Sequence, residues 1–119
     1  MPFDPQSLRY DAAGLIPVVA QQHDTGEVLM VAWMNPEALA RTLATGEVTY
    51  WSRSRQAFWV KGETSGHRQR LVELRVDCDR DCLLVLVDQT GPACHTNRRT
   101  CFYTAVRHGA EVEILRPEA

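Results

Sequence analysis

Short runs of apolar residues, separated by polar and glycine-containing segments, follow one another along most of the chain. Runs at residues 16–20 and 28–33 flank a polar tetrapeptide, in which Asp24 and Gly26 suit a tight turn. Similar runs, rich in β-branched and aromatic residues, recur at residues 48–52, 58–60, 71–77, 83–87 and 102–106. The pattern predicts a β-hairpin near the N-terminus and five later strands.

One segment between these runs carries the signals of a helix. Asn35 is a good N-cap, Pro36 suits the first helical position, and Glu37 places an acid in the first turn. Gly46 follows as a common stop signal. We therefore expect an α+β fold, mostly antiparallel β with one main helix. The chain of 119 residues is about one domain long, so we expect residues 1–119 to form a single domain.

The charge and hydropathy of the chain limit its partners. The formal net charge is −2, so no general attraction to nucleic acid or to an anionic membrane is expected. No run approaches the roughly 20 apolar residues of a membrane span, and the N-terminus lacks the basic and then apolar layout of a secretion signal. We expect a cytoplasmic protein that binds neither nucleic acid nor membranes.

Positive charge is concentrated in one window, residues 51–70. This window contains five basic residues and one acid, Glu63, which gives a local charge of 5 − 1 = +4. It forms either a solvated basic face or a local site for phosphate groups. Polar, glycine-containing loops at residues 61–67 and 89–100 are where a rigid scaffold usually carries its chemistry.

Three acids recur at alternate positions around the end of one predicted strand. If this segment is extended, Asp77, Asp79 and Asp81 point to one side and Cys78 to the other. Closely spaced carboxylates repel one another, and a hard cation such as Mg²⁺ relieves the repulsion. The alternative is a polar turn between two strands, and the spacing alone leaves both open.

The chain contains four cysteines: Cys78, Cys82, Cys94 and Cys101. In a cytoplasmic protein they are more typical of thiols or metal ligands than of disulfides. Four thiolates would close a structural zinc site, whereas three thiolates and a water would leave a catalytic position open, and the spacing does not choose between these. Cys82 enters an apolar strand, and we interpret it as a small residue that binds no metal.

Two histidines lie in the polar loops. His95 follows Cys94 directly, and His67 ends the segment at residues 64–67 beside the basic window. A histidine in either position exchanges protons with a reacting water or is an exposed loop residue, and its surroundings in the sequence do not decide which.

Three stretches of the chain together resemble one protein family. They are Tyr-Trp-Ser-Arg-Ser-Arg at residues 50–55, Trp-Val-Lys-Gly-Glu-Thr-Ser-Gly-His at 59–67, and residues 76–81 together with Gln-Thr-Gly-Pro-Ala-Cys-His-Thr at 89–96 and Cys-Phe-Tyr at 101–103. The sequence resembles the phosphoribosyl-AMP cyclohydrolases from about Gly14 to Tyr103. The resemblance implies a hydrolase of histidine biosynthesis that opens the adenine ring of a doubly phosphorylated nucleotide at its N1–C6 bond.

The resemblance also implies an intertwined homodimer with shared active sites and two metals. Zinc is implied at the subunit interface on Cys78, Cys94 and Cys101, with Cys78 from the partner chain. Mg²⁺ is implied on the acids: Asp77, Asp79 and Asp81. Some members of the pathway carry a C-terminal pyrophosphohydrolase domain, and we expect none after Ala119.

In the implied reaction, hydroxide attacks C6 of the positively charged ring. His95 is the first candidate for moving the proton between the attacking water and N1, and His67 is the second. Arginine and lysine side chains suit the two phosphates. We assign substrate binding to Trp51, Ser52, Arg53, Arg55, Lys61, Thr64 and Ser65.

Two other classes of protein remain as alternatives. A zinc nucleobase deaminase attacks the same kind of carbon, but its His-x-Glu and Pro-Cys-x-x-Cys signature is absent, because the cysteine after Cys94 is Cys101. A non-catalytic, zinc-stabilised binding module would use all four cysteines. Counting the thiols that metal protects separates it from the cyclohydrolase, for which three are expected.

Overall fold

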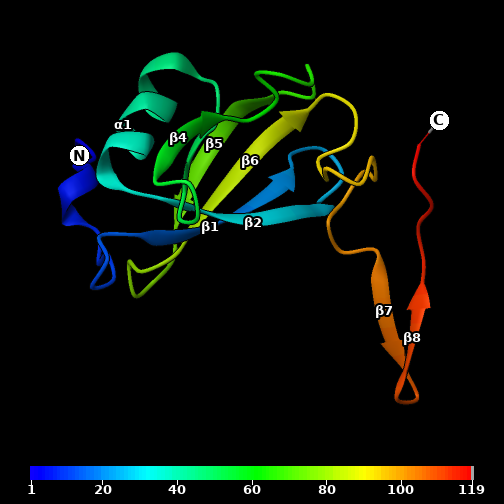
Figure 1. Ribbon diagram of the computed structural model, residues 1–119. Coiled ribbons are helices and arrows are strands. Elements are labelled where there is room, and N and C mark those ends of the chain that lie inside the picture. Colours follow the sequence, from blue (N-terminus) through cyan, green and yellow to red (C-terminus); the bar gives the residue numbers. More distant parts are fainter. Residues whose placement is uncertain (119) are drawn as a thin grey trace.

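A four-stranded β-sheet forms the centre of the molecule, and the computed structural model describes residues 1–118 (Figure 1). A short 3-10 helix (Pro5–Ser7) precedes the sheet. The strands β1 and β2 pair antiparallel, as do β5 and β6, whereas β1 and β6 are parallel. Their order is β2-β1-β6-β5, and their bounds are β1 (Ile16–Gln22), β2 (Val28–Met34), β5 (Gln69–Val76) and β6 (Leu83–Gln89).

One face of this sheet is covered by helix α1 (Pro36–Thr45) and by the hairpin of β3 (Thr49–Ser52) and β4 (Ala57–Val60). Successive side chains of a strand point to opposite sides, so every second residue of β1 and β6 lies on the covered face. These residues form much of the hydrophobic core, and five of them are fully buried: Ile16, Val18, Ala20, Val85 and Val87.

Helix α1 begins and ends where the sequence predicts. The side-chain oxygen of Asn35 accepts a hydrogen bond from the N–H of Ala38 at 2.8 Å, and Gly46 ends the helix with φ of 77°, a conformation that glycine adopts without strain. The buried hydroxyl of Thr42 donates to the carbonyl of Ala38 and accepts from the N–H of Thr49. This hydroxyl fixes the helix to β3.

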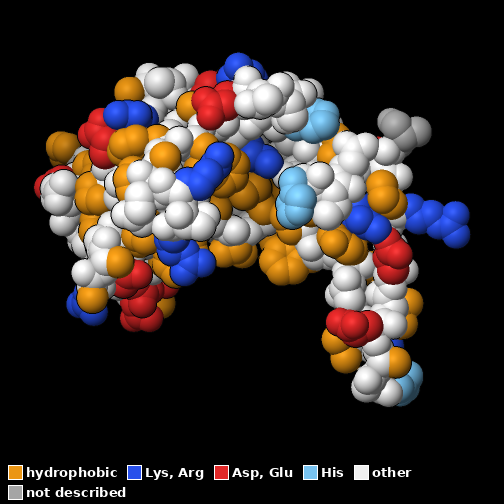
Figure 2. Space-filling view, viewed as in Figure 1, with side chains coloured by type: hydrophobic (Ala, Val, Ile, Leu, Met, Phe, Trp, Pro, Cys, Tyr) orange, Lys and Arg blue, Asp and Glu red, His pale blue; other side chains and the backbone are white. Residues whose placement is uncertain are grey.

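A second hairpin, made of β7 (Thr104–Arg107) and β8 (Ala110–Glu113), projects from the body as a thin arm (Figures 1 and 2). Within the described residues these two strands pair only with each other. We call residues 102–114 the arm. It exposes large apolar side chains, which are Phe102, Val106, Val112 and Ile114.

The predicted elements are confirmed, with differences at their ends. The α+β class with mostly antiparallel strands is correct, and one α-helix is present in the described part of the chain. The last predicted strand begins two residues later than expected, and β8 is not predicted, because its four residues include two charged ones. No helix within residues 1–118 is long and apolar enough to cross a membrane.

Candidate functional site

The two loops expected to carry chemistry meet at one end of the sheet. The first ends where β5 begins and the second starts where β6 ends, because Gln69 and Gln89 are opposite each other in the antiparallel register. The side-chain amide of Gln89 donates to the carbonyl of His67 at 3.1 Å. We call residues 61–68 the lysine loop and residues 89–101 the cysteine loop.

The cysteine loop folds back on itself and places two cysteines side by side. The N–H of Cys94 donates to the carbonyl of Arg98 at 3.0 Å, and the N–H of Cys101 donates to the carbonyl of Leu29 in β2 at 2.8 Å. Cys94 is buried and Cys101 lies at the surface, and the two thiols are close enough for each to shift the pKa of the other. Two of the three predicted zinc ligands are therefore adjacent within one chain.

These two thiols differ in acidity. Burial raises the pKa of Cys94, but hydrogen bonds from Thr96 (Oγ1 to Sγ 3.0 Å) and Cys101 and the positive charge of Lys61 outweigh it, so the pKa lies below the usual value. Desolvation of its sulfur, and then the neighbouring charge of Cys94, raise the pKa of Cys101 to about 11. Cys94 thus loses its proton more easily than Cys101, and a divalent metal that bound the pair would displace the proton of Cys101.

Lys61 joins the lysine loop to the cysteine loop. Its ammonium donates to the carbonyl of Ala93, directly before Cys94, and lies 5.6 Å from the centre of the Trp59 ring. Burial lowers the pKa of Lys61, whereas the charges of Cys101 and Cys94 raise it. The sequence predicts a role in substrate binding for this residue, and the structure directs its ammonium to the cysteine loop.

The predicted catalytic histidines lie in these two loops. His95 is exposed and follows Cys94. The ring of His67 packs against Gly91 of the cysteine loop so closely that a Cβ atom on Gly91 would lie 2.8 Å from its Cδ2. A side chain at residue 91 would therefore require the ring of His67 to move.

Glycine is also required inside the lysine loop, and this yields a test of its packing. Gly62 has φ of 81°, and a Cβ there would lie 2.4 Å from the carbonyl carbon of His67. Gly66 has a similar φ of 80° but nothing within 4 Å of such a Cβ. Gly66→Ala should thus cost only backbone strain, about 1 kcal/mol, whereas Gly62→Ala should cost about 1–3 kcal/mol more.

Urea unfolding of both variants measures this difference. The wild type provides the reference and Gly66→Ala the control for backbone strain. Equal losses of unfolding free energy in the two variants would show that the packing of the lysine loop on residue 62 is not important for stability.

The acidic segment forms a turn at the opposite end of the sheet. Of the two alternatives that the spacing leaves open, the extended segment with Cys78 facing away from three aligned acids is wrong, and the polar turn is correct. Asp77 accepts hydrogen bonds from the N–H groups of Asp81 (2.9 Å) and Cys82 (3.1 Å), and Arg80 adopts a φ of 61°. Side-chain capping of the turn by Asp77 thus overrides the alternation that a strand would impose.

The turn nevertheless gathers the three acids. Oxygens of Asp77, Asp79 and Asp81 all lie within 4.8 Å of one another on the surface. A hydrogen bond with Asp77 raises the pKa of Asp81, and desolvation and the charges of Asp77 and Asp79 add to this effect. Desolvation also acts to raise the pKa of Asp77, but hydrogen bonds from Asp81, Cys82 and Arg80 lower it overall. Such crowded carboxylates suit a hard cation.

Cys78 and Cys82 lie in this acidic turn, away from the other two cysteines. The turn and the two loops are at opposite ends of β5, whose eight residues span about 25 Å. The three acids are the only group of three or more potential metal-binding residues in the part of the chain that the structure describes. One chain therefore does not bring Cys78 to Cys94 and Cys101.

Cys82 is half-buried at the start of β6, and its thiol contacts the carbonyl of Leu83 at 3.8 Å. Burial, and then the charges of Asp77 and Asp81, raise its pKa above the usual thiol value.

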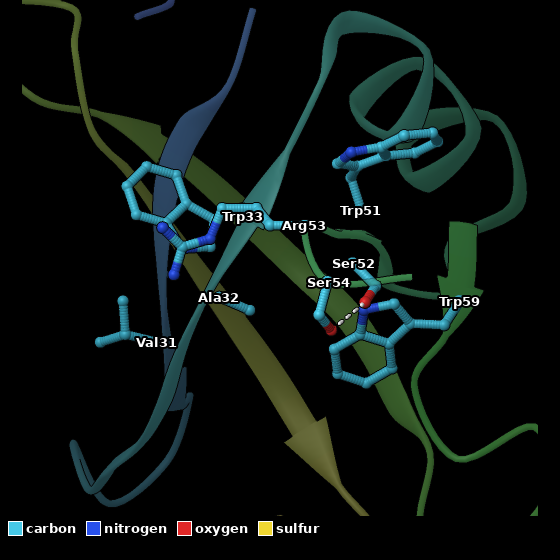
Figure 3. A pocket seen from close by; sticks show the side chains of 8 residues that line it. All are labelled: Val31, Ala32, Trp33, Trp51, Ser52, Arg53, Ser54 and Trp59. Carbon is cyan, nitrogen blue, oxygen red and sulfur yellow. Dashed lines mark hydrogen bonds between the residues drawn. The ribbon is translucent and has the colours of Figure 1, made fainter. Parts of the chain in front are cut away.

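A hollow of about 580 Å³ lies between β2 and the β3–β4 hairpin (Figure 3). The guanidinium of Arg53 is stacked over the Trp33 ring, 4.5 Å from its centre, and the hydroxyls of Ser52 and Ser54 are 3.4 Å apart. Its volume is in the usual range for sites that bind small molecules. Eight residues line it: Val31, Ala32, Trp33, Trp51, Ser52, Arg53, Ser54 and Trp59.

The structure unites only part of the predicted substrate-binding set. Trp51, Ser52 and Arg53 line the hollow together. The remaining predicted residues, which do not line it, are Arg55, Lys61, Thr64 and Ser65. Trp33 and Trp59 were not predicted as site residues. A usable signal was present, because all three tryptophans of the chain lie in predicted strands. Trp59 also connects the hollow to the cysteine loop through Lys61.

Comparison with known proteins extends over almost the whole chain. The sequence profile of phosphoribosyl-AMP cyclohydrolase matches residues 30–103, which include the hollow, the acidic turn and both loops. Phosphoribosyl-AMP cyclohydrolases of Cereibacter sphaeroides and Ruegeria pomeroyi are 76% and 75% identical over 117 residues, covering 98% of both chains in each case. That of Paracoccus denitrificans is 74% identical over 116 residues, 98% of this chain and 96% of its own. This chain belongs to the phosphoribosyl-AMP cyclohydrolase family.

Proposed function

We propose that the chain catalyses the phosphoribosyl-AMP cyclohydrolase step of histidine biosynthesis. Family membership over nearly the full length is the observation that carries this proposal. The substrate is an adenine nucleotide whose N1 bears a second phosphoribosyl group. That substituent makes the ring cationic and C6 electron-poor, so C6 is open to attack by water.

The reaction consumes one water molecule and releases no fragment. The water oxygen bonds to C6, the N1–C6 bond breaks, N1 receives a proton, and the exocyclic nitrogen remains in the product as a carboxamide. Residues that serve this reaction must orient the ring, move a proton from water to N1, and hold two phosphate groups.

Cys94, Cys101 and Cys78 of a second chain would hold zinc. The adjacent thiols of Cys94 and Cys101, one of them with a lowered pKa, fit a zinc ion by chemistry and by position. A zinc ion held by these residues would supply Lewis acidity toward water. Lys61 fixes the carbonyl of Ala93 and places a positive charge beside the thiolates, which offsets part of their mutual repulsion.

His95 and His67 are the proposed proton carriers. His95 follows a proposed zinc ligand and is free to reach solvent and substrate. His67 is held against Gly91 of the same loop, and we assign it the second role, in proton transfer or in holding substrate. The two side chains come from loops that the Gln89 amide ties together, which supports their assignment to one site.

The hollow is the proposed site for part of the nucleotide. Its tryptophans offer apolar faces on which a flat, cationic ring stacks favourably, and the guanidinium of Arg53 provides donors for phosphate. Arg55, Thr64 and Ser65 remain proposed substrate contacts on the neighbouring loops. Asp77, Asp79 and Asp81 would hold Mg²⁺, whose charge would neutralise the crowded carboxylates and favour a substrate phosphate nearby.

We also propose that the active enzyme is a homodimer in the cytoplasm. If three thiols hold one zinc, the separation along β5 requires Cys78 to come from another chain. The arm supports association, because Val106 is 73% exposed and Ile114 50% exposed on a hairpin whose strands, within residues 1–118, pair only with each other. All four cysteines are free thiols, as expected where disulfides are kept reduced.

Product analysis tests the proposed activity. The zinc-loaded protein is incubated with the N1-phosphoribosyl adenylate, and the products are followed by mass spectrometry together with an ammonia assay. A gain of one water without ammonia is expected. Release of ammonia would instead identify a deaminase, and an unchanged substrate would favour the non-catalytic binding module.

A further inference from the structure

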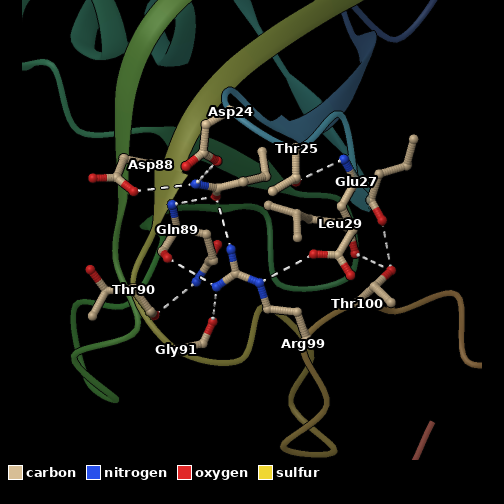
Figure 4. A network of polar contacts seen from close by, with 12 residues as sticks. Asp24, Thr25, Glu27, Leu29, Asp88, Gln89, Thr90, Gly91, Arg99 and Thr100 are labelled. Carbon is tan, nitrogen blue, oxygen red and sulfur yellow. Dashed lines mark hydrogen bonds and ion pairs between the residues drawn. The ribbon is translucent and has the colours of Figure 1, made fainter.

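The guanidinium of Arg99 joins three separate segments of the chain (Figure 4). Nη1 donates to the carbonyls of Gln89 and Gly91, both at 3.0 Å, at the start of the cysteine loop. Nη2 donates to the side-chain oxygen of Gln22 at the end of β1, at 3.0 Å, and Nε to Glu27 before β2, at 3.3 Å. One side chain thus spans the loop and the β1–β2 hairpin.

The surroundings of Arg99 distinguish it from a surface ion pair. Its side chain is 28% exposed, and three of its four acceptors are uncharged oxygens, two of them in the main chain. Gln22, only 5% exposed, also accepts from the N–H of Gln89 at 2.9 Å and donates to Asp24 at 3.0 Å. Loss of the guanidinium would leave the carbonyls of Gln89 and Gly91 without this donor. Unpaired acceptors in a partly enclosed place are costly, so we expect the cysteine loop to shift toward other donors.

The backbone of Arg99 and its neighbours is fixed as well. The carbonyl of Arg99 accepts from the N–H of Ala93 at 3.1 Å. The hydroxyl of Thr100 donates to the carbonyl of Val28 at 2.8 Å, and Cys101 follows it with its own bond to β2. The side chain of Arg99 therefore holds the start of the cysteine loop, while its main chain holds the segments that carry the two thiols.

We propose that Arg99 is a positioning residue that sets the separation and orientation of the Cys94 and Cys101 thiols for metal. The inference rests on the proposed zinc site. Without the guanidinium, the N–H of Gln89 still bonds to Gln22, but the carbonyls of Gln89 and Gly91 lose their donor. The segment from Gly91 to Cys94 is then held less firmly to β1 and β2, while Cys101 stays tied to Leu29. The side chain lies outside the hydrophobic core, so we expect the fold to survive its removal.

Cobalt provides a direct probe of thiol geometry. Co²⁺ occupies thiolate sites that bind zinc, and its visible absorption reports coordination by sulfur and the tetrahedral arrangement. Metal-free wild type, Arg99→Gln and Arg99→Lys are titrated with Co²⁺, and their thermal unfolding and association state are measured without metal. Removing a group that orients metal ligands typically weakens binding about 10- to 100-fold, and we expect a loss of this size for Arg99→Gln.

Arg99→Lys should recover only part of this loss, because one ammonium cannot reach four acceptors in three segments. Arg98→Gln is the matched control. Its guanidinium lies next in the chain but bonds to the carbonyl of Leu115 and to Glu113 and stacks on Tyr103, away from the start of the loop. We expect wild-type cobalt affinity and spectrum for this variant at equal dimer content.

The possible results separate this inference from the proposed zinc site. If wild type shows no thiolate-to-cobalt absorption, both the zinc site and the role of Arg99 are wrong. If wild type binds Co²⁺ and Arg99→Gln matches it in affinity and spectrum, the role of Arg99 alone is wrong. If Arg99→Gln fails to fold, the comparison of Arg99→Lys with wild type decides, and unchanged affinity there also overturns the inference.

Discussion

Replacing Cys94 or Cys101 with alanine is expected to remove zinc and activity together. The two thiols are adjacent and belong to one loop, so either substitution leaves at most two thiolates at the proposed site. Loss of a residue that is hydrogen-bonded to a metal ligand weakens metal binding about 10- to 100-fold, so loss of the ligand itself should weaken it more than about 100-fold. Zinc content and turnover measured on the same samples check this expectation.

Cys82→Ala is the matched control for these substitutions. Cys82 lies in the acidic turn at the far end of β5, half-buried and with a raised pKa, so we expect its removal to leave zinc content and turnover near the wild-type values. If Cys82→Ala loses zinc as completely as Cys94→Ala, four cysteines hold the metal. The non-catalytic binding module would then be the better proposal.

The second large effect is the recovery of activity when two inactive variants are mixed. Cys78→Ala and Cys94→Ala should each be inactive alone, because every site contains one altered ligand. In a mixed dimer, one site combines Cys94 and Cys101 of one chain with an intact Cys78 of the other. Random reassembly makes about half of the dimers mixed, each with one of two sites intact, so about one quarter of wild-type activity should return.

A mixture of Cys94→Ala and Cys101→Ala provides the control. Cys94 and Cys101 of each proposed site come from the same chain, so every site in a mixed dimer still lacks one of them, and mixing these variants cannot restore a complete site. Recovery in the first mixture and none in the second would place Cys78 in the partner's site. Mixed dimers that are shown to form but regain nothing would contradict the shared site, as would full activity in a strictly monomeric wild type.

Local features of this protein follow directly from its sequence. Helix α1 is bounded by Asn35 and Gly46, whose effects on backbone N–H groups and on φ act within a few residues. The strands follow from short apolar runs, and the tight turn before β2 from Asp24 and Gly26. The motif residues also identify the family without any coordinates.

Tertiary structure alone decides how these pieces meet. Antiparallel pairing of β5 with β6 sets the lysine loop beside the cysteine loop, and the same pairing places Cys78 about 25 Å away, at the other end of the strands. The alternating acids also leave an extended segment and a turn both open, and only the structure shows the turn, in which hydrogen bonds to Asp77 bend the chain.

The remaining parts of the site depend on contacts between residues distant in the sequence. Arg99 meets Gln22 and Glu27 more than 70 positions away, and Trp33 meets Arg53 across the hollow. A local sequence pattern reflects the conformational preferences of neighbouring residues. These preferences act over about one turn of helix or one strand. Strand register and loop packing arise from the whole buried core, and they alone determine which side chains share a site.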